Sequence, residues 1–194
     1  WSPSGGLSSS TASNPTANPS SNTTYTLTET ITATGCQQSN SVAVTVNPVP
    51  AATTGGNQTI CVGQSVTLGA APVGGNTYSW SPSTSLSSAT VSNPTANPSS
   101  SITYTLTETI TATGCQKSNS ATITVNLLPT ANTGFDQTIC DGQSIVLGAA
   151  PVGGNTYSWS PATALSSSTS SSPTSNPGST ITYTLTETVT ATGC

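Results

Sequence analysis

The sequence predicts an all-β protein built of tandem antiparallel β-sandwich domains, and three observations lead to this prediction. First, 34 Ser and 40 Thr occur among 194 residues, whereas only 3% are charged, so strong helix formers such as Lys, Arg and Glu are scarce. Second, the abundant Thr, Val, Ile and Tyr favour strands, and Asn, Gly, Pro and Ser favour turns. Third, apolar and polar residues alternate in several stretches, as in strands with one buried face.

Chains rich in Ser, Thr and Pro are often disordered or glycosylated stalks. Here the regular alternation and one Trp in each repeat favour a packed core instead. No run of 18 apolar residues occurs, so we expect no membrane insertion, and no signal peptide is recognisable. Neither Trp1 nor Cys194 resembles a natural terminus, which indicates a part of a longer protein.

The chain repeats itself with a constant spacing of 79 residues, as the positions of Trp1, Trp80 and Trp159 show. Residues 50–115 and 129–194 are identical at 50 of 66 aligned positions. In an all-β sequence, such a period predicts β-sandwich modules joined end to end, and Pro-containing linkers are expected at 46–56 and 125–135. We therefore predict a first segment (1–49) without its first strands, a complete second segment (50–128) and a third segment (129–194) without its last strand.

In the second segment, the first three predicted strands follow one another with short turns. Residues 65–70 place Val66 and Leu68 on one face, and residues 77–80 place Tyr78 beside Trp80. Residues 90–97 contain Pro94 and are followed by Pro98, and neither proline can donate to a ladder, so this stretch is predicted to be an edge strand.

The last two predicted strands, 102–111 and 120–126, alternate most regularly. In the first of them Thr occupies every second position, which predicts a polar outer face opposite Tyr104 and Leu106. The second has Ala121, Ile123 and Val125 on its inner face. The predicted core residues of the second and third segments are Leu68, Tyr78, Trp80, Tyr104, Leu106, Trp159 and Tyr183.

The spacing of Leu68 and Trp80, with Tyr104 two residues before Leu106, resembles the central pin of an immunoglobulin-type sandwich, with Leu in place of its two cysteines. The stretches QTICVGQSVTLGA, NTYSWSP, NPTANPSSSITYTLTET and ATGC followed by ATITVN resemble the PKD-like and Ig-like tandem repeats of giant secreted surface proteins of the Bacteroidota. This resemblance covers essentially the whole chain. It implies export, often by the type IX route, and a role in adhesion, gliding or extracellular filaments. The WDFGDG motif typical of PKD repeats is absent, and with it the acidic residues that some relatives use for Ca²⁺.

Regularly spaced cysteines predict disulfides and an oxidising, extracellular or cell-surface location. Two pairings are open. One lies within segments, Cys61–Cys115 and Cys140–Cys194, but Cys61 precedes Leu68 by seven residues and Cys115 follows Leu106 by nine, which places them near opposite ends of an Ig-like sandwich. The other, Cys61–Cys194, joins two segments. The disulfide candidates are Cys36, Cys61, Cys115, Cys140 and Cys194.

The residues needed for catalysis are missing. The chain has no His, so neither a Ser–His nor a Cys–His pair can form. Glu29, Glu108 and Glu187 are one repeat apart and cannot form an acid–base pair, and Asp136 and Asp141 are expected to be solvated loop residues rather than metal ligands. We therefore expect no enzyme activity, no cofactor and no metal.

Glu108 shares the parity of the inward residues of its strand, so we expect a structural role near a joint between segments rather than ligand binding. The only basic side chain is that of Lys117, which argues against nucleic acid or anionic lipid as a partner.

Nearly identical, uncharged and hydroxyl-rich segments repel each other little and present the same face at a constant interval. We therefore expect a structural filament or adhesin stalk whose partners are identical chains, with other surface proteins or prey or host surfaces as further partners. A ligand- or glycan-binding adhesin module and the spacer of a secreted enzyme remain as alternatives.

Overall fold

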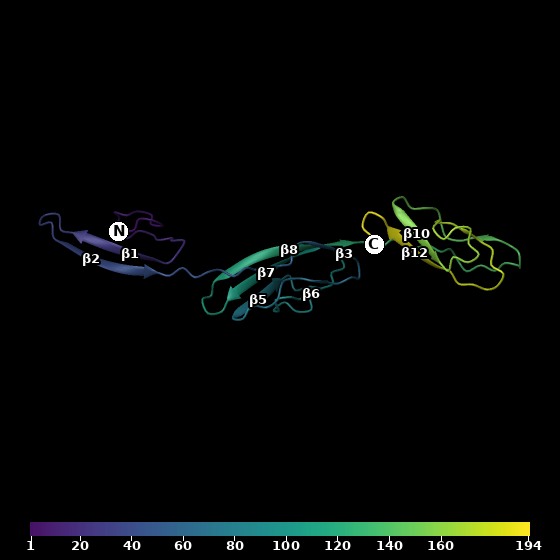
Figure 1. Cartoon of the computed structure of the whole chain (residues 1–194), viewed down its shortest axis with the longest axis horizontal. Coiled ribbons are helices and arrows are strands. Elements are labelled where there is room, and N and C mark those ends of the chain that lie inside the picture. Colours follow the sequence, from purple (N-terminus) through teal and green to yellow (C-terminus); the bar gives the residue numbers. More distant parts are fainter. The chain divides into compact units, whose positions relative to one another are not determined.

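The computed structural model describes all 194 residues, and its regular elements are all β-strands (Figure 1). Several sheets form, none of them closed into a barrel. No helix long and apolar enough to cross a membrane is present. The strands are β1 (Thr23–Thr30), β2 (Gln37–Val44), β3 (Gln58–Cys61), β4 (Val66–Thr67), β5 (Asn76–Ser81), β6 (Thr95–Ala96), β7 (Ile102–Ile110), β8 (Gln116–Asn126), β9 (Ile145–Val146), β10 (Asn155–Ser160), β11 (Thr174–Ser175) and β12 (Thr184–Val189).

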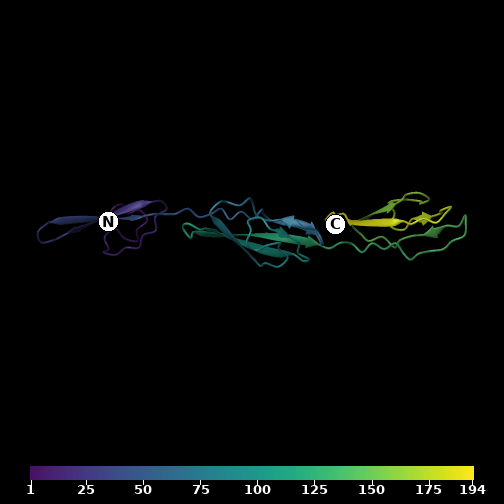
Figure 2. The same cartoon turned by 90° about the horizontal axis from the view of Figure 1, so that it is seen from below.

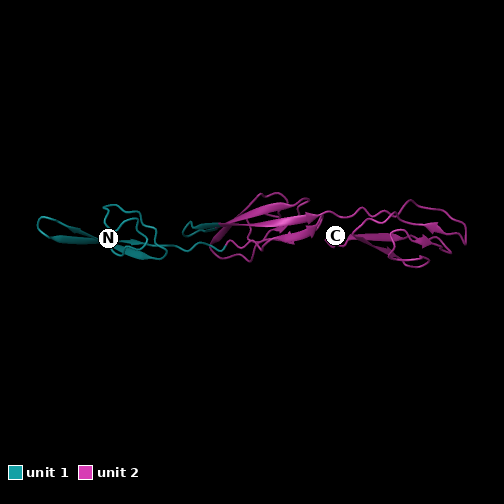
Figure 3. Cartoon of the chain, turned by 90° about the horizontal axis from the view of Figure 1, so that it is seen from above, with its two compact units in different colours: residues 1–51, 109–117 teal, residues 52–108, 118–194 magenta.

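The chain divides into two compact units, one of residues 1–51 and 109–117 and the other of residues 52–108 and 118–194 (Figure 3). In the first unit, β1 and β2 form an antiparallel hairpin, which Figure 2 shows from a second direction. Tyr25 on β1 is 1% exposed, and its hydroxyl donates a hydrogen bond to the Gly5 carbonyl at 2.7 Å.

The main sheet of the second unit has the strand order β3-β8-β7-β5. β3 runs parallel to β8, with Gln58 opposite Ile123 and Cys61 opposite Asn126. β7 and β8 run antiparallel, because Thr103 pairs with Thr122 and Thr107 with Ser118. Two short strands, β4 and β6, form a separate antiparallel pair.

The core of the second segment is formed where this sheet meets the β4–β6 region, and the alternation of apolar residues explains which side chains enter it. The indole nitrogen of Trp80 donates to the Val91 carbonyl at 3.0 Å, and the hydroxyl of Tyr104 donates to the Thr84 carbonyl at 2.8 Å. Both aromatic rings are thus buried with their polar atoms satisfied. The buried apolar cluster comprises Ile60, Leu68, Trp80, Ala96, Tyr104, Leu106, Ala121 and Ile123.

Gly69 lies where two chain segments touch. Its φ is +76°, and a Cβ at this position would lie 1.9 Å from the Ser92 carbonyl oxygen. Only glycine permits both the left-handed conformation and this close approach. Gly148 repeats the arrangement, with a Cβ only 2.1 Å from the Ser171 carbonyl oxygen.

The third segment repeats the hydrogen bonds of the second. β10 pairs with β12, and β9 pairs with β11. Trp159 is 3% exposed and donates to the Ser170 carbonyl, and Tyr183 donates to the Thr163 carbonyl. In each case the donor and acceptor are separated by the same number of residues as their counterparts in the second segment, 11 for Trp and 20 for Tyr.

Two of the predicted strands are much shorter in the structure. The prediction of a strand over residues 90–97 was wrong except at β6. Pro94 precedes β6 and Pro98 follows it two residues later, and neither can donate a backbone hydrogen bond that would extend the strand. The stretch 65–70 is a strand only at β4, and the Leu68 amide beyond it donates to the Pro94 carbonyl at 2.9 Å. In the opposite direction, β8 starts earlier than predicted, at Gln116.

Candidate functional site

The structure contains no group of three or more His, Cys, Asp and Glu side chains that could hold a metal ion. Asp136 and Asp141 are exposed in a loop, and Glu29 is exposed on β1. The polar and sulfur-containing groups that the fold does bring together are a disulfide, a buried carboxylate and rows of hydroxyl groups.

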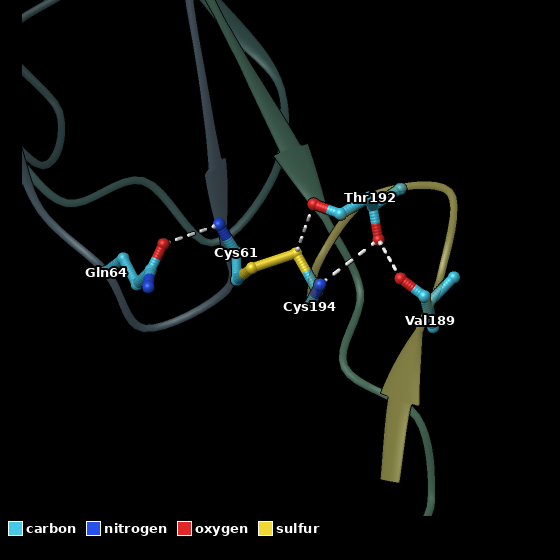
Figure 4. Close-up of a disulfide and its surroundings, with 5 residues drawn as sticks. All are labelled: Cys61, Gln64, Val189, Thr192 and Cys194. Atoms are coloured by element: carbon cyan, nitrogen blue, oxygen red, sulfur yellow. Dashed lines mark hydrogen bonds between the residues drawn. A yellow bond between two sulfur atoms is a disulfide. The ribbon is translucent and has the colours of Figure 1, made fainter. Parts of the chain in front are cut away.

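The disulfide joins Cys61 to Cys194, whose Cα atoms are 5.5 Å apart (Figure 4). Cys61 is the last residue of β3, in the second segment. Cys194 ends a tight turn that follows β12 in the third segment, where the Val189 amide donates to the Cys194 carbonyl at 2.7 Å. The bond therefore connects two segments that are predicted from the sequence to be separate modules.

Local hydrogen bonds hold both cysteines in place. The Cys61 amide donates to Oε1 of Gln64 at 3.0 Å, and the Cys194 amide donates to the hydroxyl oxygen of Thr192 at 3.3 Å (Figure 4). Cys194 is 7% exposed and Cys61 is partly buried, so solvent has little access to the sulfur atoms. A thiol reductant would reach this bond less easily than a surface disulfide.

Of the two pairings left open by the sequence, the structure contains the one between segments. The geometry of β8 explains why Cys61 does not pair with Cys115. Cys115 directly precedes β8, whereas Cys61 lies opposite Asn126, the last residue of that strand. At roughly 3.3 Å per residue, the 11 residues of β8 separate these two positions by about 36 Å, far beyond the reach of a disulfide.

The remaining disulfide candidates, Cys36, Cys115 and Cys140, are free in the structure. Cys36 and Cys140 are exposed, and Cys115 is partly buried. The regular spacing of the five cysteines in the sequence does not distinguish these three from the bonded pair.

The carboxylate of Glu108 is buried, with 3% of the residue exposed. Its Oε2 accepts a hydrogen bond from the Ala52 amide, and its Oε1 accepts one from the side-chain amide of Asn76, both at 2.7 Å. Ala52 is itself fully buried, with a φ of 52°. Because an unpaired buried carboxylate is very unfavourable, these two donors make the burial possible and hold the start of the second segment against β5 and β7.

Glu187, which lies one repeat after Glu108, has different surroundings. Oε1 of Glu187 accepts a hydrogen bond from the side chain of Asn155 at 2.7 Å, but no backbone amide donates to its second oxygen, and the residue is partly exposed.

The sequence analysis did not single out Asn76 and Asn155, the two residues that donate hydrogen bonds to these glutamates. Their position on the same strand face as Trp80 and Trp159 was the signal that could have identified them.

Hydroxyl groups on the outer faces of the hairpins bond to each other across the strands. We call these rows the hydroxyl ladder. Its members lie directly opposite each other, and each pair is within 2.9 Å. The pairs are Thr26–Ser41 and Thr28–Ser39 between β1 and β2, and Thr103–Thr122, Thr105–Ser120 and Thr107–Ser118 between β7 and β8.

A comparison with known protein families finds no match for this chain, and a comparison with curated proteins finds none either.

Proposed function

We propose that this chain is a structural repeat region of an extracellular filament or adhesin stalk, in which identical chains associate side by side. In this proposal, each repeat of 79 residues is an Ig-like or PKD-like β-sandwich of the kind found in giant secreted surface proteins of the Bacteroidota. The chain carries no catalytic site in this role, and its partners are further copies of itself.

The Cys61–Cys194 disulfide is the observation that supports the proposal most directly. A bond within one domain would stabilise that domain alone, whereas this bond restricts the motion of one segment relative to the next. The stabilisation expected from closing so long a loop is about 5 kcal/mol in the chain-entropy treatment. Stable disulfides form in oxidising surroundings, which fits a cell-surface location.

The hydroxyl ladder supports lateral association. Each hydroxyl group that bonds across a hairpin keeps unused lone pairs on its oxygen, which a second chain can engage. With a formal net charge of −4 over 194 residues, repulsion between two such surfaces is weak. Long Lys side chains, which many proteins use to keep sheets apart, are absent from the ladder.

Binding of sugars has less support, because it usually requires exposed aromatic rings. Trp80, Tyr104 and Trp159 are all buried, and Phe135, which is 92% exposed, stands alone as a large exposed aromatic residue.

The proposal is tested by electron microscopy and sedimentation velocity of the purified chain without any added ligand. We expect laterally associated bundles that grow with protein concentration. The double variant Ser118→Lys, Ser120→Lys adds two charges to the exposed hydroxyl ladder of β8 and should abolish bundling while the circular dichroism spectrum stays that of a β-protein.

The matched control is Ser99→Lys, Ser100→Lys, which adds the same charge in an exposed loop away from the ladder. Bundling should persist in this control. A chain that stays monomeric at every concentration, or bundles that both double variants weaken equally, would contradict the proposal.

A further inference from the structure

The Cys61–Cys194 disulfide, which forms a joint between the second and third segments, connects two points of the chain that the backbone also connects by a much longer way. The two cysteines are 133 positions apart, and the backbone between them contains every strand from β4 to β12. The disulfide nevertheless holds their Cα atoms 5.5 Å apart. A pull along the chain therefore meets two connections in parallel, a short one through sulfur and a long one through residues 62–193.

The short connection carries the tension. Residues 62–193 are folded and could lengthen by unfolding, but the disulfide fixes the distance between the two ends of this stretch. No part of it can be drawn out while the disulfide is intact. The folded sheets are held by noncovalent contacts whose net free energy is small, whereas the short connection yields only when a covalent bond breaks.

β3 brings the tension to the disulfide. A pull that enters the second segment through residues 52–57 passes along β3 and reaches Cys61, the last residue of this strand. A strand rises about 3.3 Å per residue against a limit of about 3.6 Å for a fully extended chain, so β3 transmits a pull with little change of length. The ladder between β3 and β8 then bears little load, because the pull enters and leaves through the two ends of β3 itself.

On the other side of the disulfide, Cys194 ends the tight turn after β12 (Figure 4). The Val189 amide donates to the Cys194 carbonyl at 2.7 Å, and the Gly193 amide donates to the Val189 carbonyl at 2.8 Å. A pull on the carboxyl side of Cys194 reaches the sulfur atom before it reaches β12. The pairing of β12 with β10 therefore also lies outside the path of the tension.

With the disulfide open, the tension takes a different path through the second segment. It enters at the start of β3 and leaves from the end of β8, and these two strands are parallel neighbours in which Cys61 lies opposite Asn126. Opposite pulls on parallel strands slide one along the other, so all four positions of the ladder are loaded together. The Val62 amide adds one more bond, to the Asn126 carbonyl at 2.9 Å. Once this short ladder breaks, the rest of the segment can be drawn out.

We propose that the Cys61–Cys194 disulfide carries tension past residues 62–193, so that the sheets of the second and third segments stay folded under forces that unfold them in the reduced chain. This inference rests on the proposed filament or stalk only for the source of the tension. Its consequence is a chain whose maximum length under load depends on the redox state of one bond.

Single-molecule force spectroscopy of a chain limited to residues 1–194, held by peptide tags at both ends, tests this proposal. In the oxidised chain we expect length to be released only from residues 1–61. After dithiothreitol is added, the same molecules should release up to about 450 Å more, because the 133 positions between the cysteines can then extend by about 3.4 Å each. The variant Cys61→Ser should release this length without reductant. The control Cys140→Ser, which removes a free cysteine, should behave as the oxidised wild type.

A second pair of variants tests the path in the reduced chain. Val62→Pro removes the amide that donates to Asn126. Proline suits this position, because Val62 precedes Gly63, whose φ is +87°, in a turn closed by a bond from the Gln64 amide to the Cys61 carbonyl. Under reducing conditions, Val62→Pro should lower the force at which the second segment unfolds, whereas Val62→Ala, which keeps the amide, should leave it nearly unchanged. In the oxidised chain neither variant should release length from residues 62–193.

The proposal is overturned if the oxidised chain releases length from residues 62–193, if reduction adds no length, or if Val62→Pro and Val62→Ala change the unfolding force of the reduced chain equally. All of these measurements are made on single molecules and do not require association between chains. Failure here therefore leaves lateral bundling intact, and failure of bundling leaves the transmission of tension through the disulfide intact.

Discussion

Glu108 shows how a single carboxylate can hold two strands and a linker together. Both of its oxygens accept hydrogen bonds, one from the Ala52 backbone and one from Asn76. The equivalent Glu187 keeps only the asparagine contact. The same residue type in the same repeat position therefore contributes differently, depending on whether a backbone amide reaches it.

Replacement of Glu108 by Gln should lower the free energy of unfolding by about 1–3 kcal/mol, because the new amide group would face either the Ala52 amide or the Asn76 amide, donor against donor. Urea unfolding followed by tryptophan fluorescence measures the change. Glu187→Gln is the matched control and should have a smaller effect. Equal losses in both variants would show that the Ala52 contact contributes nothing.

Because Tyr104 is buried, we expect the stability of the folded chain to vary with pH in the alkaline range. Burial raises the pKa of its hydroxyl group above the ordinary value of 10.0, because the charged phenolate is poorly solvated in the core. The protonated form is therefore favoured in the folded state. The stabilisation is fully present below pH 10 and is lost as the pH rises through 10 toward the folded-state pKa.

Denaturant unfolding of wild type and Tyr104→Phe between pH 8 and pH 11.5 tests this dependence. The variant lacks the bond to Thr84 and should be less stable at pH 8, but the difference between the two proteins should shrink as the pH rises above 10. A constant difference over the whole range would exclude a role for Tyr104 ionisation.

At the scale of elements, strand length depends on neighbours as much as on sequence. The alternation of Tyr104 and Leu106 with threonines predicts β7, because in a strand every second side chain faces the core. The tetrapeptide QTIC forms β3 in one place and no strand in the other, although its letters are the same. No local pattern separates these two cases, since the difference lies in β8, more than fifty residues along the chain.

Amide hydrogen exchange of a chain limited to residues 1–194 provides a direct comparison of these two tetrapeptides. We expect clear protection at Thr59 and Ile60 and little or none at Thr138 and Ile139, since only the first pair belongs to a ladder. The intrinsic exchange rates are nearly equal because the residues are the same. Similar protection at both places would mean that QTIC holds a strand without β8.

The candidate site could be predicted from the sequence only in part. Inward parity identified Glu108 as a residue with a structural role, and the cysteine spacing reduced the disulfide to two pairings. The choice between them required the parallel alignment of β3 with β8, which puts Cys61 beside Asn126. Asn76 was missed because an asparagine in a strand is usually assigned to the outer face or a turn.

For the molecule as a whole, the disulfide between Cys61 and Cys194 is the covalent cross-link that restrains the chain in addition to its backbone. Breaking it with the Cys61→Ser variant should lower the stability of the second unit by up to about 5 kcal/mol, the loop-entropy limit for a loop of this length. Differential scanning calorimetry measures the loss. Cys140→Ser, which removes a free cysteine, is the control and should change the melting temperature little.

Peptide mapping without reduction checks the connectivity itself. We expect the Cys61 and Cys194 peptides to be recovered as one species, with Cys36, Cys115 and Cys140 open to alkylation. Recovery of a Cys61–Cys115 species instead would contradict the joint described above.

The same bond also affects survival in surroundings rich in proteases. Its two cysteines are 133 positions apart in the sequence, so one cut of the backbone anywhere between them yields two fragments that remain covalently attached through sulfur. Such a nicked molecule migrates as intact chain until a reductant is added. The cross-link thus provides a second covalent route along the chain, and a single cleavage within it does not sever the molecule.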